Sequence, residues 1–368
     1  MKTKRLIVGS SSGKYPILIG FNLISKIPQI FKQNRINFTK CLLFVDEKVP
    51  KKFLKKIRKS LKGKENYTII YKSNEINKSQ KTINKILDFL LKKNFSRKDY
   101  LISIGGGITG DVGGFAASLL KRGIKFINIP TTLLAQVDSS IGGKTGINSK
   151  YGKNMIGSFY QPKLVISDMN FLASLPKKEI ICGYGEILKH SLIANKNFYK
   201  FLNKNFNKII NLKSPFIEKA IFESCKIKKN FVENDEKEQG KRKTLNFGHT
   251  FAHAFEATLN YSKKLNHGEA VILGIQIALN FSLQNKFLNE KNFYEIAAHL
   301  KNPLLPSDIK KYFSQKDLEK IVYFMTKDKK NDTDKIQIML LKKIGSPIIN
   351  KEFKKDKLKT FLKKELTY

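Results

Sequence analysis

Residues 100–117 read YLISIGGGITGDVGGFAA, and this stretch decides the expected fold. An apolar run of strand length leads into three glycines and then into small residues suited to a helix. Positions 105, 107 and 110 satisfy the pattern G-x-G-x-x-G, in which glycines let the backbone approach a pyrophosphate at a helix N-terminus. A glycine-rich turn that serves only close helix–strand packing is the alternative.

The acid of the standard dinucleotide fingerprint is missing, because residues 128–132 at the end of the following strand read NIPTT. Asp46 and Glu75, at other strand ends, are the candidates for holding a ribose if a dinucleotide binds.

Strand-like and helix-like segments alternate on both sides of this stretch. The expected strands are 5–8, 15–19, 41–45, 67–71, 100–104 and 125–129, and the expected helices are 47–61 and 79–94. This alternation predicts an α/β fold with a mainly parallel sheet and helices on both faces. After about residue 175 helical patterns dominate, over 177–208, 214–234, 247–261, 268–286 and 291–300, followed by a β-like stretch at 336–341 and a helix at 353–364.

The change of pattern predicts two domains. Residues 1–173 form a Rossmann-like α/β domain and residues 174–368 an all-α domain, with a ligand site expected in the cleft between them.

Composition excludes several classes of protein. The 368 residues are 41% hydrophobic, too apolar for a disordered chain, yet no run approaches the roughly 18 apolar residues of a membrane span. Only three apolar residues follow the basic start, which is unlike a signal peptide. The three cysteines are far apart and form neither a disulfide framework nor a thiolate metal site, so we expect a cytoplasmic protein.

The net charge is +40, from 70 Lys and Arg against 30 Asp and Glu. Such a charge is typical of proteins that bind nucleic acids or anionic membranes. Here the lysines are dispersed along the chain, with no basic tail and no arginine-rich segment. A nucleic-acid binder needs basic residues clustered with stacking aromatics, so compositional drift explains the charge better.

Residues 131–132 and 138–146 form a polar stretch without strand or helix periodicity. Its GGKT sequence fails as a Walker loop, because Asp138 stands where the first glycine is required. The hydroxyls, one carboxylate and one lysine, continued by Lys153 and Asn154, favour an anionic small-molecule site over an ordinary surface loop.

Three of the five histidines, His249, His253 and His267, fall within 19 residues. The first two are spaced i, i+4 and share a helix face, and Glu186 opens an earlier helix. One glutamate and two histidines are a catalytic-zinc donor set, although spacing leaves open which two histidines bind, or whether they are core or capping residues. Nearby residues that could hold a carboxylate or phosphate are Lys228, Glu238, Arg242 and Asn246.

Together these segments resemble the 3-dehydroquinate synthase family. The strings that carry the resemblance are GGGITGDVGGFAA (105–117), RGIKFINIPTTLLAQVDSSIGGKTGIN (122–148), GKNMIGSFYQP (152–162), GEILKH (185–190), LNFGHTFAHAFE (245–256) and HGEAV (267–271). The resemblance covers nearly the whole chain, and PTTLLAQVDSSIGGKT is its most specific part.

The resemblance implies an NAD-dependent lyase that needs a divalent metal, zinc or cobalt. Its substrate would be an anionic sugar phosphate, 3-deoxy-D-arabino-heptulosonate 7-phosphate, converted to 3-dehydroquinate and phosphate. The implied steps are transient oxidation, β-elimination of phosphate, reduction, ring opening and aldol closure, so NAD is not consumed. A homodimer, with neither nucleic acid nor membrane as partner, is also implied.

The resemblance also implies the site residues. The metal ligands are Glu186, His249 and His267. The catalytic residues are Lys144, Lys189, Lys228, Arg242, Asn246 and His253. Substrate contacts are these six together with Arg122, Asp138, Asn154, Glu238 and one lysine of the 329–330 pair, taken as Lys330. The NAD contacts are Asp46, Ser73, Asn74, Glu75, Ile76, Asn77, Lys78, Gly106, Gly107, Ile108, Thr109, Gly110, Asp111, Thr131, Thr132, Lys144, Lys153, Phe171, Leu172, Ala173 and Ser174.

The sequence departs from the family pattern at two places. Ser73-Asn74 replaces the usual Asp-Gly or Ser-Gly before Glu75, and His190 stands where Tyr is common.

Two related enzyme types compete with this interpretation. A polyol dehydrogenase of the glycerol dehydrogenase type should lack the basic set that includes Lys228 and Arg242. A 2-deoxy-scyllo-inosose synthase shares most motifs, but its substrate has no carboxylate for those two residues to bind.

Overall fold

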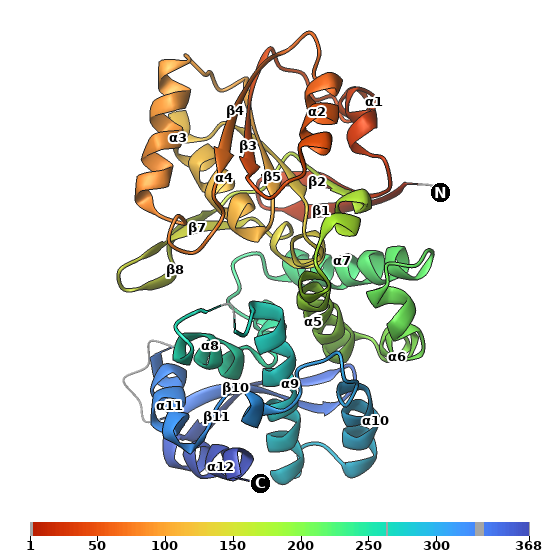
Figure 1. The fold of residues 1–368 in the computed structure, drawn as a ribbon, viewed down its shortest axis with the longest axis vertical. Coiled ribbons are helices and arrows are strands. Elements are labelled where there is room, and N and C mark those ends of the chain that lie inside the picture. The colour runs from red at the N-terminus through yellow and green to blue at the C-terminus, as the bar shows by residue number, and fades with distance from the viewer. Residues whose placement is uncertain (1–2, 263, 328–334, 368) are drawn as a thin grey trace. The chain divides into compact units, whose positions relative to one another are not determined.

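The computed structural model describes residues 3–262, 264–327 and 335–367 (Figure 1). The chain divides into two compact units, and the division does not follow chain order. Unit 1 comprises residues 1–180 and 228–237, and unit 2 comprises residues 181–227 and 238–368. The sequence predicts one boundary, between residues 173 and 174. In the structure the first stretch of unit 1 runs to Ile180, and the short segment 228–237 belongs to unit 1 as well.

Unit 1 is built on a seven-stranded sheet with the strand order β1-β2-β9-β6-β5-β3-β4. Its strands are β1 (Lys4–Ser10), β2 (Gly13–Gly20), β3 (Lys40–Asp46), β4 (Glu65–Tyr71), β5 (Tyr100–Gly105), β6 (Lys125–Pro130) and β9 (Leu164–Asp168). Only the β1–β2 pair is antiparallel. The predicted α/β fold with a mainly parallel sheet is therefore confirmed.

Helices cover both faces of this sheet (Figure 1). They are α1 (Ile27–Gln33), α2 (Lys51–Ser60), α3 (Gln80–Lys92) and α4 (Gly107–Leu119). Alternate residues of β3 serve the two faces: Leu43 and Val45 pack in the core that includes α1 and α2, and Leu42 and Phe44 pack in the core with α3 and α4. This burial on both faces explains why β3 is apolar throughout rather than alternating.

Two parts of unit 1 differ from the sequence expectation. The polar stretch after residue 138 was expected to lack regular structure, but its end forms the hairpin of β7 (Lys144–Ser149) and β8 (Gly152–Phe159). The two backbones lie very close there, since a Cβ on Gly157 would be 2.1 Å from the Thr145 carbonyl oxygen. Glycine makes this contact possible and also removes the side-chain alternation that marks a strand. Strand β9, inside the sheet, was not expected either.

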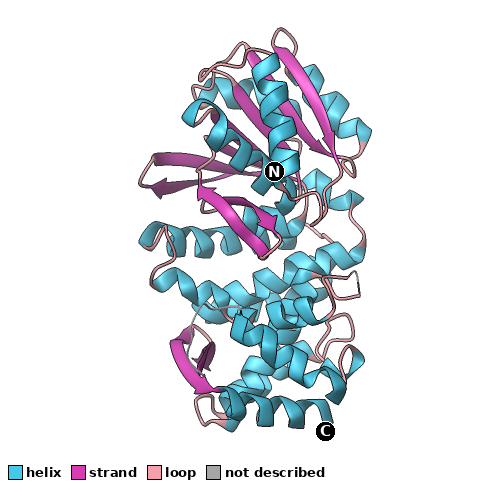
Figure 2. Ribbon diagram, turned by 90° about the vertical axis from the view of Figure 1, so that its left-hand side faces the viewer, coloured by secondary structure: helices cyan, strands magenta, loops and turns pink. Residues whose placement is uncertain are grey.

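The second half of the chain is mainly helical, as Figure 2 shows, with one added hairpin. The helices are α5 (Lys177–Ala194), α6 (Lys196–Ile210), α7 (Phe216–Asn234), α8 (His249–Thr258), α9 (His267–Gln284), α10 (Glu290–Leu300), α11 (Leu318–Lys327) and α12 (Lys355–Thr367), and the hairpin strands are β10 (Lys335–Lys343) and β11 (Ser346–Lys354). The helix expected over 177–208 is two helices, because the Asn195 side chain caps α6 by accepting from the Phe198 amide. Within the described ranges, no helix combines the length and apolar character needed to cross a bilayer.

Glycines let helices of unit 2 touch backbone to backbone. A Cβ on Gly274 of α9 would lie 2.2 Å from the Gly248 carbonyl oxygen, next to the start of α8. A Cβ on Gly268 of α9 would lie 1.9 Å from the Cys182 carbonyl oxygen on α5, and one on Gly185 would lie 2.6 Å from the Gly268 carbonyl oxygen. No side chain larger than hydrogen fits at these contacts.

We expect Gly274→Ala to destabilise the protein although alanine is the better helix former. The added methyl group forces α8 and α9 apart, and overpacking of this kind outweighs a helix-propensity gain of about 1 kcal/mol. A net loss of about 2 kcal/mol lowers the thermal unfolding midpoint by about 4–8 °C. Gly20→Ala is the matched control, because its Cβ would have 3.6 Å contacts only and should leave the midpoint nearly unchanged. Equal midpoints for the two variants would contradict the close-contact explanation.

His299 lies in the core of unit 2 among aromatic rings. Its Nε2 lies 2.9 Å from Tyr184 Oη and its Nδ1 lies 2.8 Å from Asn203 Oδ1. Burial lowers the pKa of His299 to about 4, so the folded protein holds a neutral imidazole. The unfolded chain, with an ordinary histidine pKa of about 6.5, binds a proton first as the pH falls.

We therefore expect stability to fall as the pH drops from 7 toward 4, since the unfolded state binds more protons in that window. Between pH 7 and pH 5 His299 alone accounts for a loss of about 2 kcal/mol in the free energy of unfolding. Urea unfolding at both pH values measures this loss. His299→Gln is less stable at pH 7 but should lose about 2 kcal/mol less than the wild type on going to pH 5. An unchanged pH difference in this variant would rule His299 out as the source.

Candidate functional site

The glycine turn of unit 1 lies at the carboxyl end of β5, where α4 begins. The neighbour of β5 on one side is β3, so Asp46 at the end of β3 comes close to this turn: a Cβ on Gly105 would lie 2.9 Å from the Asp46 Cβ. Strand order reverses between β3 and β5, because β4 lies beyond β3 and β6 beyond β5. Ligands of open α/β sheets bind at such a reversal.

The start of α4 has the features of an anion site. No side chain caps the helix at Gly106, so its first amide groups can donate to a ligand. A Cβ on Gly107 would lie 2.9 Å from Ser139 Oγ, and one on Gly106 would lie 3.3 Å from Thr132 Cγ2. The turn is therefore a shallow cradle bounded by Thr132 and Ser139, which side chains on the glycines would fill.

Polar side chains surround this turn in two linked groups. Lys78, which is buried, donates from Nζ to Asp111 Oδ2 (2.6 Å) and to Asn154 Oδ1. Glu75 accepts from Lys153 Nζ (2.9 Å) and from Asn148 Nδ2 (2.8 Å). Burial alone would raise the pKa of Glu75, but Lys153 and Asn148 outweigh it and lower the pKa, so the carboxylate stays charged.

The predicted NAD residues are only partly gathered at the turn. Thr131 donates its amide to the Gly105 carbonyl oxygen, and Thr109 Oγ1 lies 3.3 Å from Ser73 Oγ. Phe171 is buried and packs against Phe53 with ring centroids 4.5 Å apart, which makes it a core residue. The other predicted NAD residues lie between β4 and α3 (Asn74, Ile76 and Asn77), on α4 (Ile108 and Gly110) and in the 3-10 helix after β9 (Leu172, Ala173 and Ser174).

Segment 228–237 brings a buried lysine into unit 1. Lys228 Nζ donates to Asp138 Oδ1 at 2.6 Å. The segment is fixed to the β1–β2 turn, because Glu233 accepts from the Gly9 amide (2.6 Å) and Glu236 from the Ser11 amide (2.7 Å). Lys144 is exposed on β7.

Arg122 does not join this group. It is exposed and lies between the end of α4 and the start of β6, at the amino edge of the sheet. The 13 residues of α4 separate it from the glycine turn by on the order of 20 Å. Unit 1 thus places Arg122, a predicted substrate contact, at the edge of the sheet opposite the predicted NAD turn, and the role of Arg122 stays a prediction.

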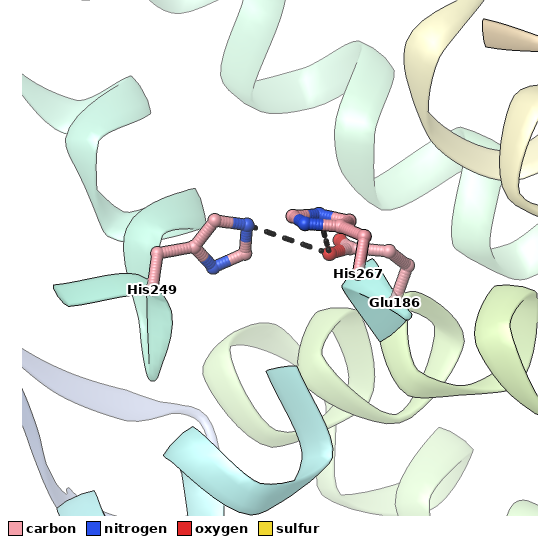
Figure 3. Close-up of side chains that lie close together, drawn as sticks. All are labelled: Glu186, His249 and His267. Atoms are coloured by element: carbon pink, nitrogen blue, oxygen red, sulfur yellow. Dashed lines mark ion pairs between the residues drawn. The ribbon is translucent and has the colours of Figure 1, made fainter. Parts of the chain in front are cut away.

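Glu186, His249 and His267 converge in unit 2 from α5, α8 and α9 (Figure 3). Each offers one ligand atom, and these atoms lie within 4.8 Å of one another. Glu186 Oε1 lies 3.5 Å from His249 Nε2 and 3.7 Å from His267 Nε2. Ligand atoms around a tetrahedral zinc ion lie about 3.3–3.6 Å apart, so the observed spacing fits a metal site.

The tautomers suit metal binding as well. His249 Nδ1 donates to the Phe247 carbonyl oxygen at 3.4 Å, and His267 Nδ1 donates to Glu256 Oε2 at 3.0 Å. When the imidazoles are neutral, both Nε2 atoms therefore carry the lone pair and face Glu186. His253 has its ring 5.3 Å from that of His249 and 6.2 Å from that of His267, beside the trio rather than within it.

The pKa values of the two histidines shift in opposite directions. Burial lowers the pKa of His249 well below its ordinary value, and Lys189 lowers it further, so this ring is neutral. Burial also lowers the pKa of His267, but Glu256 and Glu186 outweigh it and raise the pKa to about 10. The negative potential that holds a proton there would equally hold a divalent cation in its place.

Further polar residues of unit 2 lie on α5 and in the segment before α8. Lys189, one helical turn after Glu186 on α5, forms a buried ion pair with Glu186 Oε2. His190 Nδ1 lies 2.7 Å from Ser224 Oγ, and Arg242 is only 2% exposed. Asn246 Nδ2 donates to Glu238 Oε1 at 2.9 Å.

Backbone strain accompanies three predicted substrate residues. Asn154, Glu238 and Arg122 have φ angles of +57°, +59° and +63°. Left-handed backbone at residues other than glycine is costly and clusters at functional sites. The predicted Lys330 lies outside the described residues.

Sequence reasoning missed Glu256. It follows His249 by seven residues and His253 by three, so all three share one face of α8. That spacing was readable in the sequence, but its contact with His267 on another helix was not.

Comparison with known proteins identifies the family. Residues 68–182 match the family described as 3-dehydroquinate synthase N-terminal, and residues 183–331 match 3-dehydroquinate synthase C-terminal. The 3-dehydroquinate synthase of Pelagibacter ubique (strain HTCC1062) is 61% identical over 363 residues, 99% of each chain. That of Bartonella quintana (strain Toulouse) is 38% identical over 374 residues, 100% of this chain and 99% of the relative.

Solved structures share the fold over nearly the whole chain. A 2-deoxy-scyllo-inosose synthase, complexed with carbaglucose-6-phosphate, NAD⁺ and Co²⁺, has a TM-score of 0.89 at 24% identity, covering 99% of this chain and 100% of its own. A 2-epi-5-epi-valiolone synthase from Streptomyces hygroscopicus subsp. jinggangensis 5008, with NAD⁺ and Zn²⁺ bound, has a TM-score of 0.85 at 21% identity, covering 95% and 96%. With the two family matches and the full-length identities, these findings show that the chain belongs to the 3-dehydroquinate synthase family.

Proposed function

We propose that this protein converts 3-deoxy-D-arabino-heptulosonate 7-phosphate to 3-dehydroquinate and phosphate. The observation that carries the proposal is the 61% identity to a 3-dehydroquinate synthase over 99% of both chains. The match covers 99% of this chain, so it includes both candidate sites: the glycine turn of unit 1 and the Glu–His–His trio of unit 2. The activity is a lyase activity that eliminates phosphate and closes a carbocycle.

NAD is the proposed cofactor of unit 1, and it supplies a hydride acceptor that later returns the hydride. The residues present fit it: the uncapped start of α4 can donate amide groups to the pyrophosphate, and Asp46 lies where a ribose needs an acceptor. Lys78 and Lys153 add positive charge, each already held by a carboxylate. The NAD⁺ in the two solved relatives supports this assignment.

Zinc or cobalt is the proposed metal, held by Glu186, His249 and His267 in unit 2. The metal, when bound, polarises substrate oxygens as a Lewis acid. The chain's own residues prepare the ligands: Lys189 fixes one oxygen of Glu186, while the Phe247 carbonyl and Glu256 fix the two histidine tautomers. This arrangement leaves Oε1 and two Nε2 lone pairs for the ion.

The remaining predicted catalytic residues bind and orient an anionic substrate. Arg242 is a buried guanidinium whose fork suits a carboxylate or phosphate, and Lys228 is a buried ammonium held by Asp138. Charge-assisted hydrogen bonds of this kind are strong when water is excluded. Because Arg242 and Lys228 can bind a carboxylate as well as a phosphate, they favour 3-deoxy-D-arabino-heptulosonate 7-phosphate over a substrate that has a phosphate alone.

A homodimer is also part of the proposal, and the position of Arg122 supports it. This residue lies at the amino edge of the unit 1 sheet, away from the glycine turn at the carboxyl edge. If the substrate binds beside the glycine turn, the Arg122 that contacts it would come from a second copy of the chain. The proposal also places the enzyme in the cytoplasm, with support from Cys41, Cys182 and Cys225, which are buried thiols outside any disulfide.

The first test is phosphate release from 3-deoxy-D-arabino-heptulosonate 7-phosphate by purified protein with catalytic NAD⁺. We expect release without net NADH, loss of release on chelation, and restoration by added zinc or cobalt. His267→Ala should lower the rate at least 100-fold, because it removes a proposed ligand. No release, with steady NADH formation from a polyol instead, would transfer the assignment to the dehydrogenase relatives.

The second test asks whether Arg122 acts across subunits. Arg122→Ala and His267→Ala homodimers should both be inactive or nearly so. Subunits mixed by co-refolding form heterodimers in which one site has His267 intact and receives Arg122 from the other subunit. We expect activity to reappear in the mixture, at up to half the wild-type value per heterodimer. Failure to complement, with heterodimers demonstrated, would contradict the trans assignment.

A further inference from the structure

Helix α8 presents three chemically active side chains on one face. His249, His253 and Glu256 follow one another at i, i+4 and i+7, which returns to nearly the same direction after two turns. The Glu256 side chain is 10% exposed, and its Oε2 lies 3.0 Å from Nδ1 of His267 on α9. Helix α8 thus provides one proposed ligand, His249, and through Glu256 it also holds another, His267 of α9.

The two histidine ligands are held differently. His249 Nδ1 meets a neutral backbone carbonyl at the long distance of 3.4 Å, whereas His267 Nδ1 meets a carboxylate at 3.0 Å. His267 is also the more exposed of the two, with 33% of its side chain accessible against 11% for His249. His267, whose ring is less restrained by packing, is therefore the ligand that a carboxylate holds.

We propose that Glu256 is a positioning residue for the metal: its carboxylate fixes the His267 ring and tautomer and strengthens Nε2 as a ligand. The inference rests on the proposed function, since it requires that Glu186, His249 and His267 bind a divalent ion. A carboxylate behind a ligating imidazole orients the ring and raises its basicity, and removing such a partner typically lowers metal affinity about 10–100-fold. If Glu256 served folding alone, its removal would lower stability and leave zinc affinity unchanged.

The test compares zinc affinities of metal-free protein in competition with a chromophoric chelator. Glu256→Gln keeps the shape and a hydrogen-bond acceptor but removes the charge, and we expect zinc affinity to fall about 10–100-fold. The matched control is Glu365→Gln. Glu365 lies on α12 and accepts from Asn280 Nδ2 of α9 at 2.6 Å, so it holds an asparagine of α9 where Glu256 holds a histidine of the same helix. Its zinc affinity should stay within about twofold of the wild type, because no ligand depends on it.

Glu256→Asp keeps the charge and shortens the side chain, so its affinity should lie between those of the wild type and Glu256→Gln. It also supplies the answer if Glu256→Gln fails to fold, in which case a reduced zinc affinity in the folded Asp variant supports the inference. Zinc affinity equal to wild type in Glu256→Gln, or weaker binding by the Asp than by the Gln variant, would overturn it. Wild-type protein that binds no zinc would overturn the proposed metal site itself.

Discussion

The close contact of three helix backbones is the constraint on which the metal trio depends. A glycine adjoins each proposed ligand in sequence: Gly185 precedes Glu186, Gly248 precedes His249, and Gly268 follows His267. At each of these glycines a neighbouring backbone comes so near that a Cβ would lie within 3 Å of it. This close approach brings the starts of the side chains near one another, so that the glutamate and the two histidines converge. The geometry of the site is thus set by backbone packing before any ligand atom is considered.

Buried acids carry more information in this chain than the abundant lysines do. Across the described residues, the buried acids are Asp46, Asp99, Asp168, Glu186, Glu218 and Glu256. Four of them hold backbone or hydroxyl groups: Asp46 accepts from Lys48, Asp99 from Ser96, Asp168 from Ile24, and Glu218 from Ser214. Of these four, Asp46 also lies beside the glycine turn, and the remaining two acids, Glu186 and Glu256, lie at the trio. Burying a carboxylate without a partner is costly in free energy, so each buried acid indicates a specific group that it binds.

The sequence predicts most of unit 1 because its central strands, such as β3 and β5, are largely apolar and helices such as α2 and α3 are amphipathic, and both patterns are local. Strand β9 was not predicted because it has only five residues and its position in the sheet depends on pairing with β2 and β6, which are distant in sequence. The site is predictable where a motif fixes it, as with Gly105–Gly107, and where residue type limits the choice, as with the histidines. The contact of Glu256 with His267 and the displacement of Arg122 to the opposite edge could not be predicted, because each depends on how separate elements pack.

Helix α7 begins in one unit and ends in the other, since residues 216–227 belong to unit 2 and residues 228–234 to unit 1. A nascent chain that has reached Ile180 already contains all seven strands of the main sheet, yet it lacks Lys228 and the two glutamates that hold the β1–β2 turn. Domains of a growing chain generally fold as units, the N-terminal one first. Here the first unit stays incomplete until nearly 60 further residues have been synthesised, counted from Ile180 to Lys237. The order of synthesis therefore couples the completion of one unit to the appearance of the other.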